Sequence, residues 1–442
     1  MKKKEVSINT NRYKYTDGLR TIFKDNLVIL ASEESREWIK ISRECFNILN
    51  KIIDMNLSYS EILDCFEVED DKIYFEELIE KLYKAKILKD KNDKSIRKIE
   101  EIYLIVTDRC NLSCKHCCAS AIDANSIDEL DTNDMFQVID KIVQINPQNI
   151  TISGGEPLIR QDIWLIMDYL KSKYNGSIDI LTNGLLIDES NIKNIKKYFN
   201  SISISIDGVD EESCKIIRGN NVFKNVVKKI KFLKENDFKN ISVSAVLPNN
   251  ENIRQEFENL NKNLETKPIF RHFSHSGRAG ENYKEISLNM NKYLKNRNME
   301  ENKIIDWKAY ISTDKRDIKT SACGGCETTL SIGSNGEIYP CNLLMSSNYS
   351  IGNIRKIDNI VSYISNININ SNKGYKEFLD LKLCKNERCK DCYVKSFCWS
   401  CPAECDDLLR KKEIFEDRCS KVKQKLTSVV WGVSYELYSM DN

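Results

Sequence analysis

The sequence predicts an α/β protein with a small α+β domain in front of it and a cysteine-rich, metal-bound region behind it. Three observations support this prediction. Short apolar runs alternate with longer charged stretches between residues 100 and 300, apolar positions recur at helical spacing in the first 95 residues, and ten of the 17 cysteines lie between residues 323 and 419. Strands that alternate regularly with helices indicate a parallel sheet.

Residues 1–95 are expected to form a winged-helix-like domain. Two short strand candidates, 27–30 and 38–41, precede a helix that Ser42 can cap. Ser58 and Glu61 fit a capping box for a second helix. A third helix is indicated by apolar residues at i, i+3, i+4, i+7 and i+8, which are Phe75, Leu78, Ile79, Leu82 and Tyr83. The charged run 89–95 is expected to be a linker.

Residues 100–300 contain six strand candidates, each an apolar or β-branched run: 102–106, 149–153, 178–182, 202–206, 241–246 and 268–273. The stretches between them, such as 222–234 and 252–264, have helical period. We expect a parallel sheet that is open or partly closed into a barrel, with ligand sites at the carboxyl ends of its strands.

Composition narrows the function classes. The chain carries 67 Lys and Arg against 66 Asp and Glu, so its net charge of +1 argues against a broad nucleic-acid-binding surface. No apolar run approaches the roughly 20 residues that cross a bilayer, and no apolar stretch follows the basic N-terminus as in a secretory signal. We therefore expect a cytoplasmic protein without membrane or nucleic-acid partners, whose clustered cysteines hold metal rather than disulfides.

The first strand of the predicted sheet is followed by Cys110-Asn-Leu-Ser-Cys114-Lys-His-Cys117. Three thiolates from one loop can hold three irons of a [4Fe–4S] cluster and leave the fourth iron open to a ligand. A structural zinc site is the alternative, but zinc needs a fourth ligand and usually pairs two C-x2-C hairpins. The spacing therefore favours an iron–sulfur cluster with an open iron.

This C-x3-C-x2-C run resembles that of the radical SAM superfamily, and the resemblance covers about 100–440. It implies a partial (β/α)6 barrel in which Cys110, Cys114 and Cys117 hold the cluster that binds S-adenosylmethionine (SAM). It also implies that Gly154-Gly155-Glu156-Pro157, after the second strand, is the loop for the SAM amino group. Glycines permit close backbone approach, and a carboxylate can pair with an ammonium.

Three further strand ends resemble family segments more loosely. Asn183 follows the third strand, and Ser205 ends the fourth strand at a position similar to the family's ribose-contacting segment. Arg218 comes after it and is expected to pair with the SAM carboxylate. Turn formation and salt bridges are the structural alternatives for such residues.

Residues 301–442 have weak periodicity, so we expect them to bury little apolar surface and to be held together by metal. Their Cys-x2-Cys, Gly-x4-Cys and Cys-x2-Cys-x5-Cys spacings resemble the SPASM (twitch-like) extension, which carries two auxiliary [4Fe–4S] clusters. The resemblance implies one cluster on Cys323, Cys326, Cys341 and a later cysteine. It implies another on Cys389, Cys392, Cys398 and Cys419.

The later cysteine is where this chain departs from the family. The family commonly has a cysteine four residues after the position of Cys398, and here that residue is Pro402. Cys401 comes one residue earlier and Cys405 three residues later, so either is a candidate ligand. Zinc ribbons are the alternative for the Cys-x2-Cys pairs.

The strand and helix order of residues 1–95 also resembles the RiPP recognition element, a module that binds the leader of a ribosomally made peptide. A winged helix could instead bind DNA, which would make the chain an iron–sulfur redox-sensing regulator. Residues 56–80 carry nine acidic side chains against one basic, a balance that phosphates would repel. We expect a leader peptide to add a strand at the edge formed by 38–41.

Together these features predict a radical SAM peptide maturase of the sactipeptide, ranthipeptide or a related type. It would install a thioether or a carbon–carbon crosslink in a ribosomally synthesised precursor by means of a 5′-deoxyadenosyl radical. An electron donor such as flavodoxin or ferredoxin is the implied second partner. A sulfatase-maturase-like oxidation of a protein Cys or Ser is the alternative enzyme activity.

Overall fold

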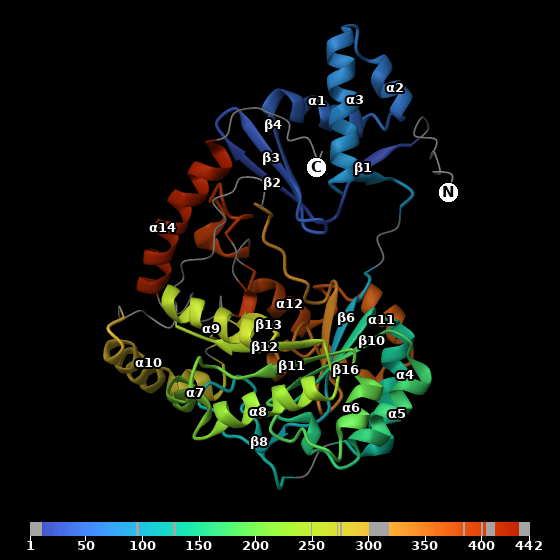
Figure 1. Ribbon diagram of the computed structural model, residues 1–442. Coiled ribbons are helices and arrows are strands. Elements are labelled where there is room, and N and C mark those ends of the chain that lie inside the picture. Colours follow the sequence, from blue (N-terminus) through green and yellow to red (C-terminus); the bar gives the residue numbers. More distant parts are fainter. Residues whose placement is uncertain are drawn as a thin grey trace. The chain divides into compact units, whose positions relative to one another are not determined.

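The computed structural model describes residues 11–93, 97–126, 130–248, 250–271, 273–274, 276–299, 318–382, 385–398, 401–403 and 412–432. The chain forms two compact units (Figure 1). Unit 1 comprises Met1–Ile96, Lys308–Cys323 and Lys382–Asn442, and unit 2 comprises Arg97–Trp307 and Gly324–Leu381. The predicted domains 1–95, 100–300 and 301–442 stay a prediction. Residues of the last predicted domain are divided between the two units.

Unit 2 is built on six parallel strands that lie in chain order. They are β6 (Glu101–Ile105), β9 (Asn149–Ser153), β10 (Ser177–Thr182), β11 (Ser201–Ser205), β12 (Ile241–Val246) and β13 (Lys267–Arg271). Ile150 pairs with Ile102 on one side and with Ile178 on the other. The alternation of strand and helix in the sequence thus becomes a parallel sheet, and the predicted α/β class is confirmed.

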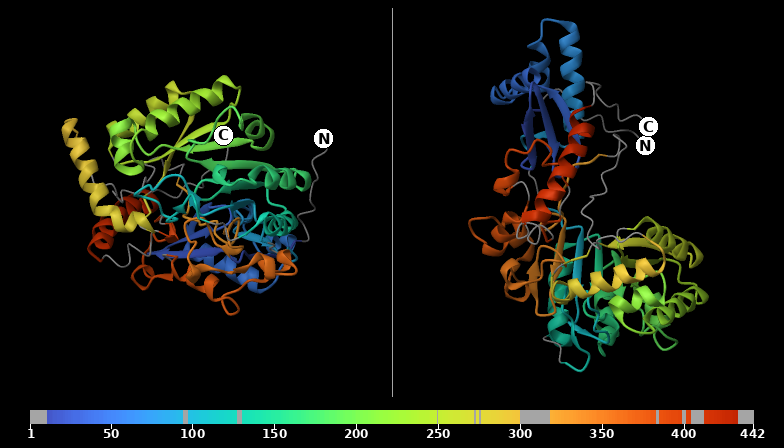
Figure 2. Two further views of the ribbon diagram at one scale, coloured as in Figure 1. Left: turned by 90° about the horizontal axis from the view of Figure 1, so that it is seen from below. Right: turned by 90° about the vertical axis from the view of Figure 1, so that its left-hand side faces the viewer.

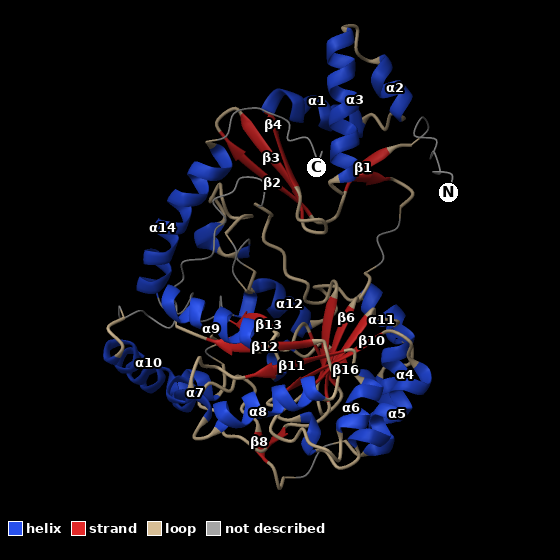
Figure 3. Cartoon of the chain, in the orientation of Figure 1, coloured by secondary structure: helices blue, strands red, loops and turns tan. Residues whose placement is uncertain are grey.

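Helices connect these strands and lie outside the sheet (Figure 3). They are α4 (Thr132–Ile145), η2 (Pro157–Ile159), α5 (Ile163–Lys173), α6 (Ile192–Tyr198), α7 (Glu211–Arg218), α8 (Val222–Glu235), α9 (Glu251–Asn263) and α10 (Arg278–Asn296). In α8 the buried residues Val222, Val226, Ile230 and Leu233 recur at helical spacing. Such an apolar stripe fixes the rotation of the helix about its axis because it must be removed from water.

Three more strands extend the same sheet beyond β6. β14 (Thr329–Ile332) runs parallel to β6, and β15 (Glu337–Tyr339) and β16 (Gly352–Asn353) follow antiparallel. The nine-stranded sheet has β13 and β16 at its two edges, as in a partial barrel. The segment continues through η4 (Ser347–Tyr349), η5 (Ile354–Lys356), α11 (Ile360–Asn366) and α12 (Lys373–Asp380).

The apolar residues of this extension are well buried. Leu330, Ile332, Ile338 and Phe378 are all fully buried. The expectation that residues 301–442 bury little apolar surface is therefore wrong for this part. Its strands are too short to show a period in the sequence, but they complete an existing sheet rather than forming a core of their own.

Unit 1 contains a three-stranded antiparallel sheet in the order β2 (Leu19–Lys24), β3 (Leu27–Ser32), β4 (Trp38–Ser42). The helices α1 (Arg43–Asp54), α2 (Tyr59–Asp64) and α3 (Glu69–Lys84) follow, and β1 (Tyr13–Tyr15) pairs with β5 (Leu88–Asp90). Ser42 caps α1, and Ser58 and Glu61 form the expected capping box. The linker begins after β5, two residues later than predicted.

The β2–β4 sheet has a hydrophobic core on each face. Val28, Leu30 and Ile41 pack with the three N-terminal helices. Ile22, Ile29 and Ala31 pack with residues from the other end of the chain, namely Val394, Phe397 and the apolar side of α14 (Lys412–Trp431) (Figure 2). Unit 1 thus joins the first and last segments of the chain in one core. None of the helices in the described ranges has the length and apolar content that a bilayer crossing requires.

Candidate active site

The loop that carries Cys110, Cys114 and Cys117 leaves the carboxyl end of β6. It is closed at its base by β7 (Arg109–Cys110), which pairs with β8 (Ile122–Asp123). The backbone N–H groups of Leu112 and Ala121 point at the sulfurs of Cys110 and Cys117, each at 3.4 Å. Burial raises the pKa of Cys110 to about 11, and the neighbouring Cys114 and Cys117 thiols add to the shift. The sulfurs of Cys110, Cys114 and Cys117 are therefore close neighbours in one loop.

The loop Gly154–Pro157 lies directly against the backbone that leads into this cysteine loop. Gly155 N–H donates to Thr107 O at 2.9 Å, and Glu156 N–H donates to Arg109 O at 2.8 Å. A Cβ at Gly154 or at Gly155 would come within 2.3 Å of these same two carbonyl oxygens. Both glycines are needed for this contact between two loops, whatever ligand they also approach.

Glu156 is completely buried, and its carboxylate joins two strand ends. It accepts hydrogen bonds from Thr182 Oγ1 at 2.8 and 3.0 Å, from Asn183 N–H at 2.7 Å and from Leu158 N–H at 3.2 Å. Burial raises the pKa of Glu156 above its usual value, and these hydrogen bonds offset only part of the rise. The expected pairing with the SAM ammonium stays a prediction; in the structure the carboxylate holds the Gly154–Pro157 loop to the end of β10.

Asn183 continues this chain of contacts into the cysteine loop. Its Nδ2 donates to Asn111 Oδ1 at 2.7 Å and lies 3.9 Å from the sulfur of Cys110. Asn183 therefore links the end of β10 to the loop of the three cysteines. The sequence placed it near the site by its position after a strand, and the structure gives it a specific partner there.

Ser205 and Arg218 each contact a neighbouring side chain, and their expected contacts with SAM stay predictions. Ser205 Oγ lies 3.2 Å from Ser244 Oγ at the end of the neighbouring strand β12. Arg218, expected to pair with the SAM carboxylate, forms a buried ion pair with Asp207 at 2.5 Å, and Asp207 also accepts from His116 Nε2 at 2.8 Å. Burial alone would raise the pKa of Asp207, but Arg218 and His116 hold it well below its usual value.

Helix α10 holds the cysteine loop, which the sequence analysis missed. Arg278 donates to Cys114 O at 3.3 Å and to Ala121 O at 2.6 Å, and Asn282 Nδ2 donates to Lys115 O at 3.2 Å. Glu285 pairs with Lys115 Nζ at 2.5 Å. These three residues recur at i, i+4 and i+7, so a polar face of one helix was the signal available in the sequence.

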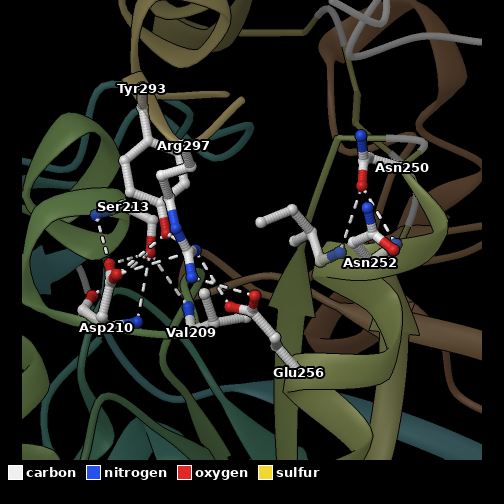
Figure 4. Close-up of polar contacts among 9 residues, drawn as sticks. Val209, Asp210, Ser213, Asn250, Asn252, Glu256, Tyr293 and Arg297 are labelled. Carbon is white, nitrogen blue, oxygen red and sulfur yellow. Dashed lines mark hydrogen bonds and ion pairs between the residues drawn. The ribbon is translucent and has the colours of Figure 1, made fainter. Parts of the chain in front are cut away.

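The far end of α10 is fastened to α7 and α9 (Figure 4). Tyr293 OH donates to Asp210 Oδ2 at 2.8 Å, and Asp210 caps α7. Arg297 donates to both carboxylate oxygens of Glu256 on α9 at 2.9 Å. Helix α10, which contacts the cysteine loop through residues 278–285, is thus also held by contacts at its C-terminus.

The residues around the cysteine loop fit a cluster that binds there. Two buried polar atoms next to it, His116 Nδ1 and Arg278 Nη2, have no hydrogen-bond partner among the described residues. Three neighbouring cysteine sulfurs and the unpaired Nη2 donor of Arg278 suit a group that supplies both positive metal and acceptor sulfur. Among the described residues, no three Cys, His, Asp or Glu side chains by themselves reach metal-ligand geometry, so the ligand sets stay predictions.

The later cysteines fall in both units. Cys326 and Cys341 belong to unit 2, where Cys326 N–H donates to Thr329 O at 3.0 Å and Cys341 follows β15. The remaining described candidates belong to unit 1: Cys323, Cys389, Cys392, Cys398, Cys401 and Cys419. Cys392 and Cys398 pack against the core beneath β2–β4. Cys405 lies outside the described residues, so the choice between Cys401 and Cys405 stays open.

Two family profiles match the chain. The Radical SAM superfamily matches residues 104–262, and SPASM, an iron–sulfur cluster-binding domain, matches residues 323–393. The first match contains Cys110, Cys114 and Cys117, and the second contains five of the later candidate ligands: Cys323, Cys326, Cys341, Cys389 and Cys392.

Curated relatives match over part of their length. Mycofactocin maturase MftC of Mycolicibacterium smegmatis is 30% identical over 32% of this chain and 36% of its own. The radical SAM cyclopropyl synthase TigE of Paramaledivibacter caminithermalis is 27% identical over 62% of this chain and 64% of its own. A GTP 3′,8-cyclase of Mannheimia succiniciproducens is 29% identical over 40% and 53%. The matches thus span between about a third and two thirds of these relatives.

Among solved structures, SuiB of Streptococcus suis bound to its precursor peptide SuiA is similar in fold. The TM-score is 0.51 at 16% sequence identity, and the match covers 90% of this chain and 97% of that chain. A radical SAM domain implies a [4Fe–4S] cluster and SAM, and a SPASM domain implies auxiliary clusters. The chain therefore carries a domain of the Radical SAM superfamily over residues 104–262, which contains the cysteine loop at the end of β6, and a SPASM domain over residues 323–393.

Proposed function

We propose that this chain is a radical SAM peptide maturase that installs a thioether or carbon–carbon crosslink in a ribosomally synthesised precursor peptide. The observation that carries the proposal is the presence of a radical SAM domain and a SPASM domain in one chain. When bound, the cluster and SAM supply a 5′-deoxyadenosyl radical that abstracts a hydrogen atom from the substrate. An electron donor of the flavodoxin or ferredoxin type would deliver the electron that this chemistry consumes.

The residues of the site divide the task between them. Cys110, Cys114 and Cys117 would hold the cluster, and Glu156 would keep the Gly154–Pro157 loop in place for the amino group of SAM. Ser205, at the end of β11, would contact the ribose. Because β6, β9, β10 and β11 are neighbours in one parallel sheet, their carboxyl ends lie along the same edge, which is where ligands of such sheets bind.

A peptide substrate is supported by the relatives and by the N-terminal segment. SuiB is similar in fold over 90% of this chain and was solved with a precursor peptide, and MftC is named a maturase. β4 is an edge strand of the β2–β4 sheet, as strand addition by a leader peptide requires. We propose residues 1–95 as the leader-binding module on this basis.

The auxiliary clusters would accept the second electron. A crosslink forms when the substrate radical bonds to a second group, such as a cysteine sulfur, and one proton and one electron leave with that step. The SPASM cysteines supply enough thiolates for two fully ligated [4Fe–4S] clusters, since two cubes need about eight and ten cysteines lie between 323 and 419. Full ligation favours electron transfer over direct binding of the substrate.

The test is modification of a peptide encoded beside the gene. Anaerobically reconstituted protein, SAM and a low-potential reductant should convert a leader-bearing peptide to a product that lacks two hydrogen atoms, seen by mass spectrometry. The matched control replaces Cys110, Cys114 and Cys117 together by Ala and should give no product. If candidate peptides remain unchanged while 5′-deoxyadenosine accumulates, the peptide part of the proposal is wrong. An aldehyde product from a Cys or Ser would point to sulfatase-type maturation instead.

A further inference from the structure

Arg218 is the last residue of α7, and its guanidinium lies between a carboxylate and a cluster cysteine. Its Nε and Nη2 each lie 2.5 Å from Asp207 Oδ2. Its Nη1 lies 3.8 Å from the sulfur of Cys114, within hydrogen-bonding range for sulfur. The side chain is only 9% exposed, so this arrangement is largely shielded from water.

Asp207 is held in turn by its own neighbours. It is 2% exposed and has a positive φ of 51°. Its Oδ1 accepts Val246 N–H at 2.6 Å, and its Oδ2 lies 2.8 Å from His116 Nε2. The carboxylate that orients Arg218 is thus fixed from β12 and from the cysteine loop at once. A guanidinium group that is held on one side by a fixed carboxylate directs its remaining N–H donors to a defined place.

The charge of Arg218 is balanced by this arrangement. Asp207 cancels it within one contact distance, so the pair offers no net positive charge to a carboxylate ligand. What remains is a directed N–H donor at the sulfur of Cys114. Hydrogen bonds to the ligand sulfurs are among the factors that set the reduction potential of an iron–sulfur cluster, because they stabilise the extra negative charge of the reduced state.

We propose that Arg218 is a positioning residue for the cluster, held by Asp207 to donate a hydrogen bond to the Cys114 sulfur and so to raise the cluster's reduction potential. In this proposal, the hydrogen bond to Cys114 takes the place of the pairing of Arg218 with the SAM carboxylate that the family resemblance suggested. The inference rests on the proposed function in one respect, because it presupposes that Cys110, Cys114 and Cys117 hold the cluster.

The experiment compares Arg218→Gln/Asp207→Asn with Arg218→Lys in the full-length reconstituted protein. The double variant removes a positive and a negative charge together, so it leaves no buried unpaired carboxylate and little change in the long-range field. Arg218→Lys keeps the positive charge but loses the planar guanidinium group that can contact Asp207 and Cys114 at the same time. Arg355→Gln is the matched control, because Arg355 also pairs with a carboxylate, that of Asp134 on α4, and this pair lies outside the contacts that hold the cysteine loop.

Two measurements are made on each protein. The midpoint potential of the cluster without SAM is obtained by redox titration followed by electron paramagnetic resonance, using the signal that disappears when the three cysteines are replaced by Ala. The dissociation constant for SAM is obtained by equilibrium dialysis. We expect the double variant to have a more negative midpoint potential with SAM affinity within about twofold of wild type, Arg218→Lys to lie between them, and the control to be unchanged.

The opposite pattern overturns the inference. An unchanged midpoint potential with SAM binding weakened about tenfold or more, as expected for the loss of a charged hydrogen bond, would make Arg218 a carboxylate ligand of SAM. An unchanged midpoint potential in Arg218→Lys and in the double variant would show that the hydrogen bond from Arg218 to Cys114 does not affect the cluster's reduction potential. Wild-type protein that forms no such cluster would instead contradict the proposed function.

Discussion

Single residues in the site act mainly by joining loops that come from different strands. Glu156 accepts from Thr182, Asn183 and Leu158, and Asn183 reaches Asn111 and Cys110. A carboxylate with several donors around it in a buried place is costly to alter, because each donor then loses its partner. Glu156, which we propose as a SAM contact, also links the loop after β9 to the end of β10.

The first prediction concerns Glu156→Gln. The Gln side chain offers one acceptor oxygen, and its NH2 group faces backbone donors, so the free energy of unfolding should fall by about 1–3 kcal/mol. SAM affinity should fall by about tenfold, while the iron content stays at the wild-type level, since Glu156 is no iron ligand. Chemical denaturation and equilibrium dialysis measure these effects.

The control is Glu337→Gln on β15, which accepts from Asn353 Nδ2 at 2.9 Å and from the Ser350 hydroxyl. It should lose stability without loss of SAM affinity. Wild-type SAM affinity in Glu156→Gln would end the assignment of Glu156 to the SAM site.

The sequence was informative about which residues gather at the site, and less so about what each touches. Strand-end positions brought Glu156 and Asn183 together as expected, because carboxyl ends of neighbouring parallel strands meet. The ion pair of Asp207 with Arg218 was not foreseen. It depends on the positive φ of Asp207 and on the direction in which α7 leaves the strand, neither of which a residue pattern encodes.

At the scale of elements, α10 is the part of the site that the sequence indicates least, because its only signal is a polar helix face. Gly277, just before it, has a φ of 59°, and a Cβ there would lie 2.6 Å from Cys118 O and 2.8 Å from Cys117 O. The first turn of α10 therefore packs directly on the backbone of the cysteine loop. Polar residues at helical spacing usually face water, so only the fold reveals this contact.

The second prediction concerns Arg278→Ala at this contact. The variant removes the donors to Cys114 O and Ala121 O, two charge-assisted hydrogen bonds that we expect to be worth about 1.5–3 kcal/mol each. The loop should open more often, and iron should pass to a chelator about tenfold faster than from wild type. Absorbance of the iron–chelator complex follows the rate.

Lys284→Ala is the control on the same helix, because Lys284 is exposed. It should release iron at the wild-type rate. Equal rates in wild type and Arg278→Ala would show that α10 does not hold the cysteine loop.

At the scale of the whole molecule, the periodicities predicted the elements well and the grouping of distant segments less well. All six predicted strands of the parallel sheet and the three N-terminal helices are present within a few residues. The packing of α14 on β2–β4 and the pairing of β14 with β6 were not predicted. Both are contacts between segments that lie hundreds of residues apart in the sequence. The spacing of apolar residues within one segment carries no information on such contacts.

This grouping changes how the N-terminal segment can be studied. Trp38 packs edge-on against Phe397 with ring centroids 5.1 Å apart, and its Nε1 donates to Ile318 O at 2.7 Å. Deleting residues 1–95 would expose the apolar residues beneath β2–β4, including those next to Cys392 and Cys398. Point substitutions on the β4 edge are therefore a cleaner test of leader binding than a deletion.

The third prediction concerns Leu426→Ala in α14. Leu426 is 2% exposed and packs in the same core as Ile29, so the cavity should lower the free energy of unfolding by about 2–5 kcal/mol. Because the core is shared, hydrogen exchange should speed up in peptides from residues 19–42, far away in sequence. Met55→Ala, at a side chain that is 64% exposed, should leave this exchange unchanged. Faster exchange confined to α14 would argue against a shared core.

The central claim is that the chain carries three [4Fe–4S] clusters, of which only the one on Cys110, Cys114 and Cys117 cleaves SAM. The most direct measurement is iron content together with 5′-deoxyadenosine formation in anaerobically reconstituted protein. Wild type should hold about twelve irons and form 5′-deoxyadenosine under strong reductant. The variant with all three cysteines replaced by Ala should hold about eight irons and form none. Zinc in place of iron in that variant would contradict the auxiliary clusters, and 5′-deoxyadenosine formed without the three cysteines would contradict the account as a whole.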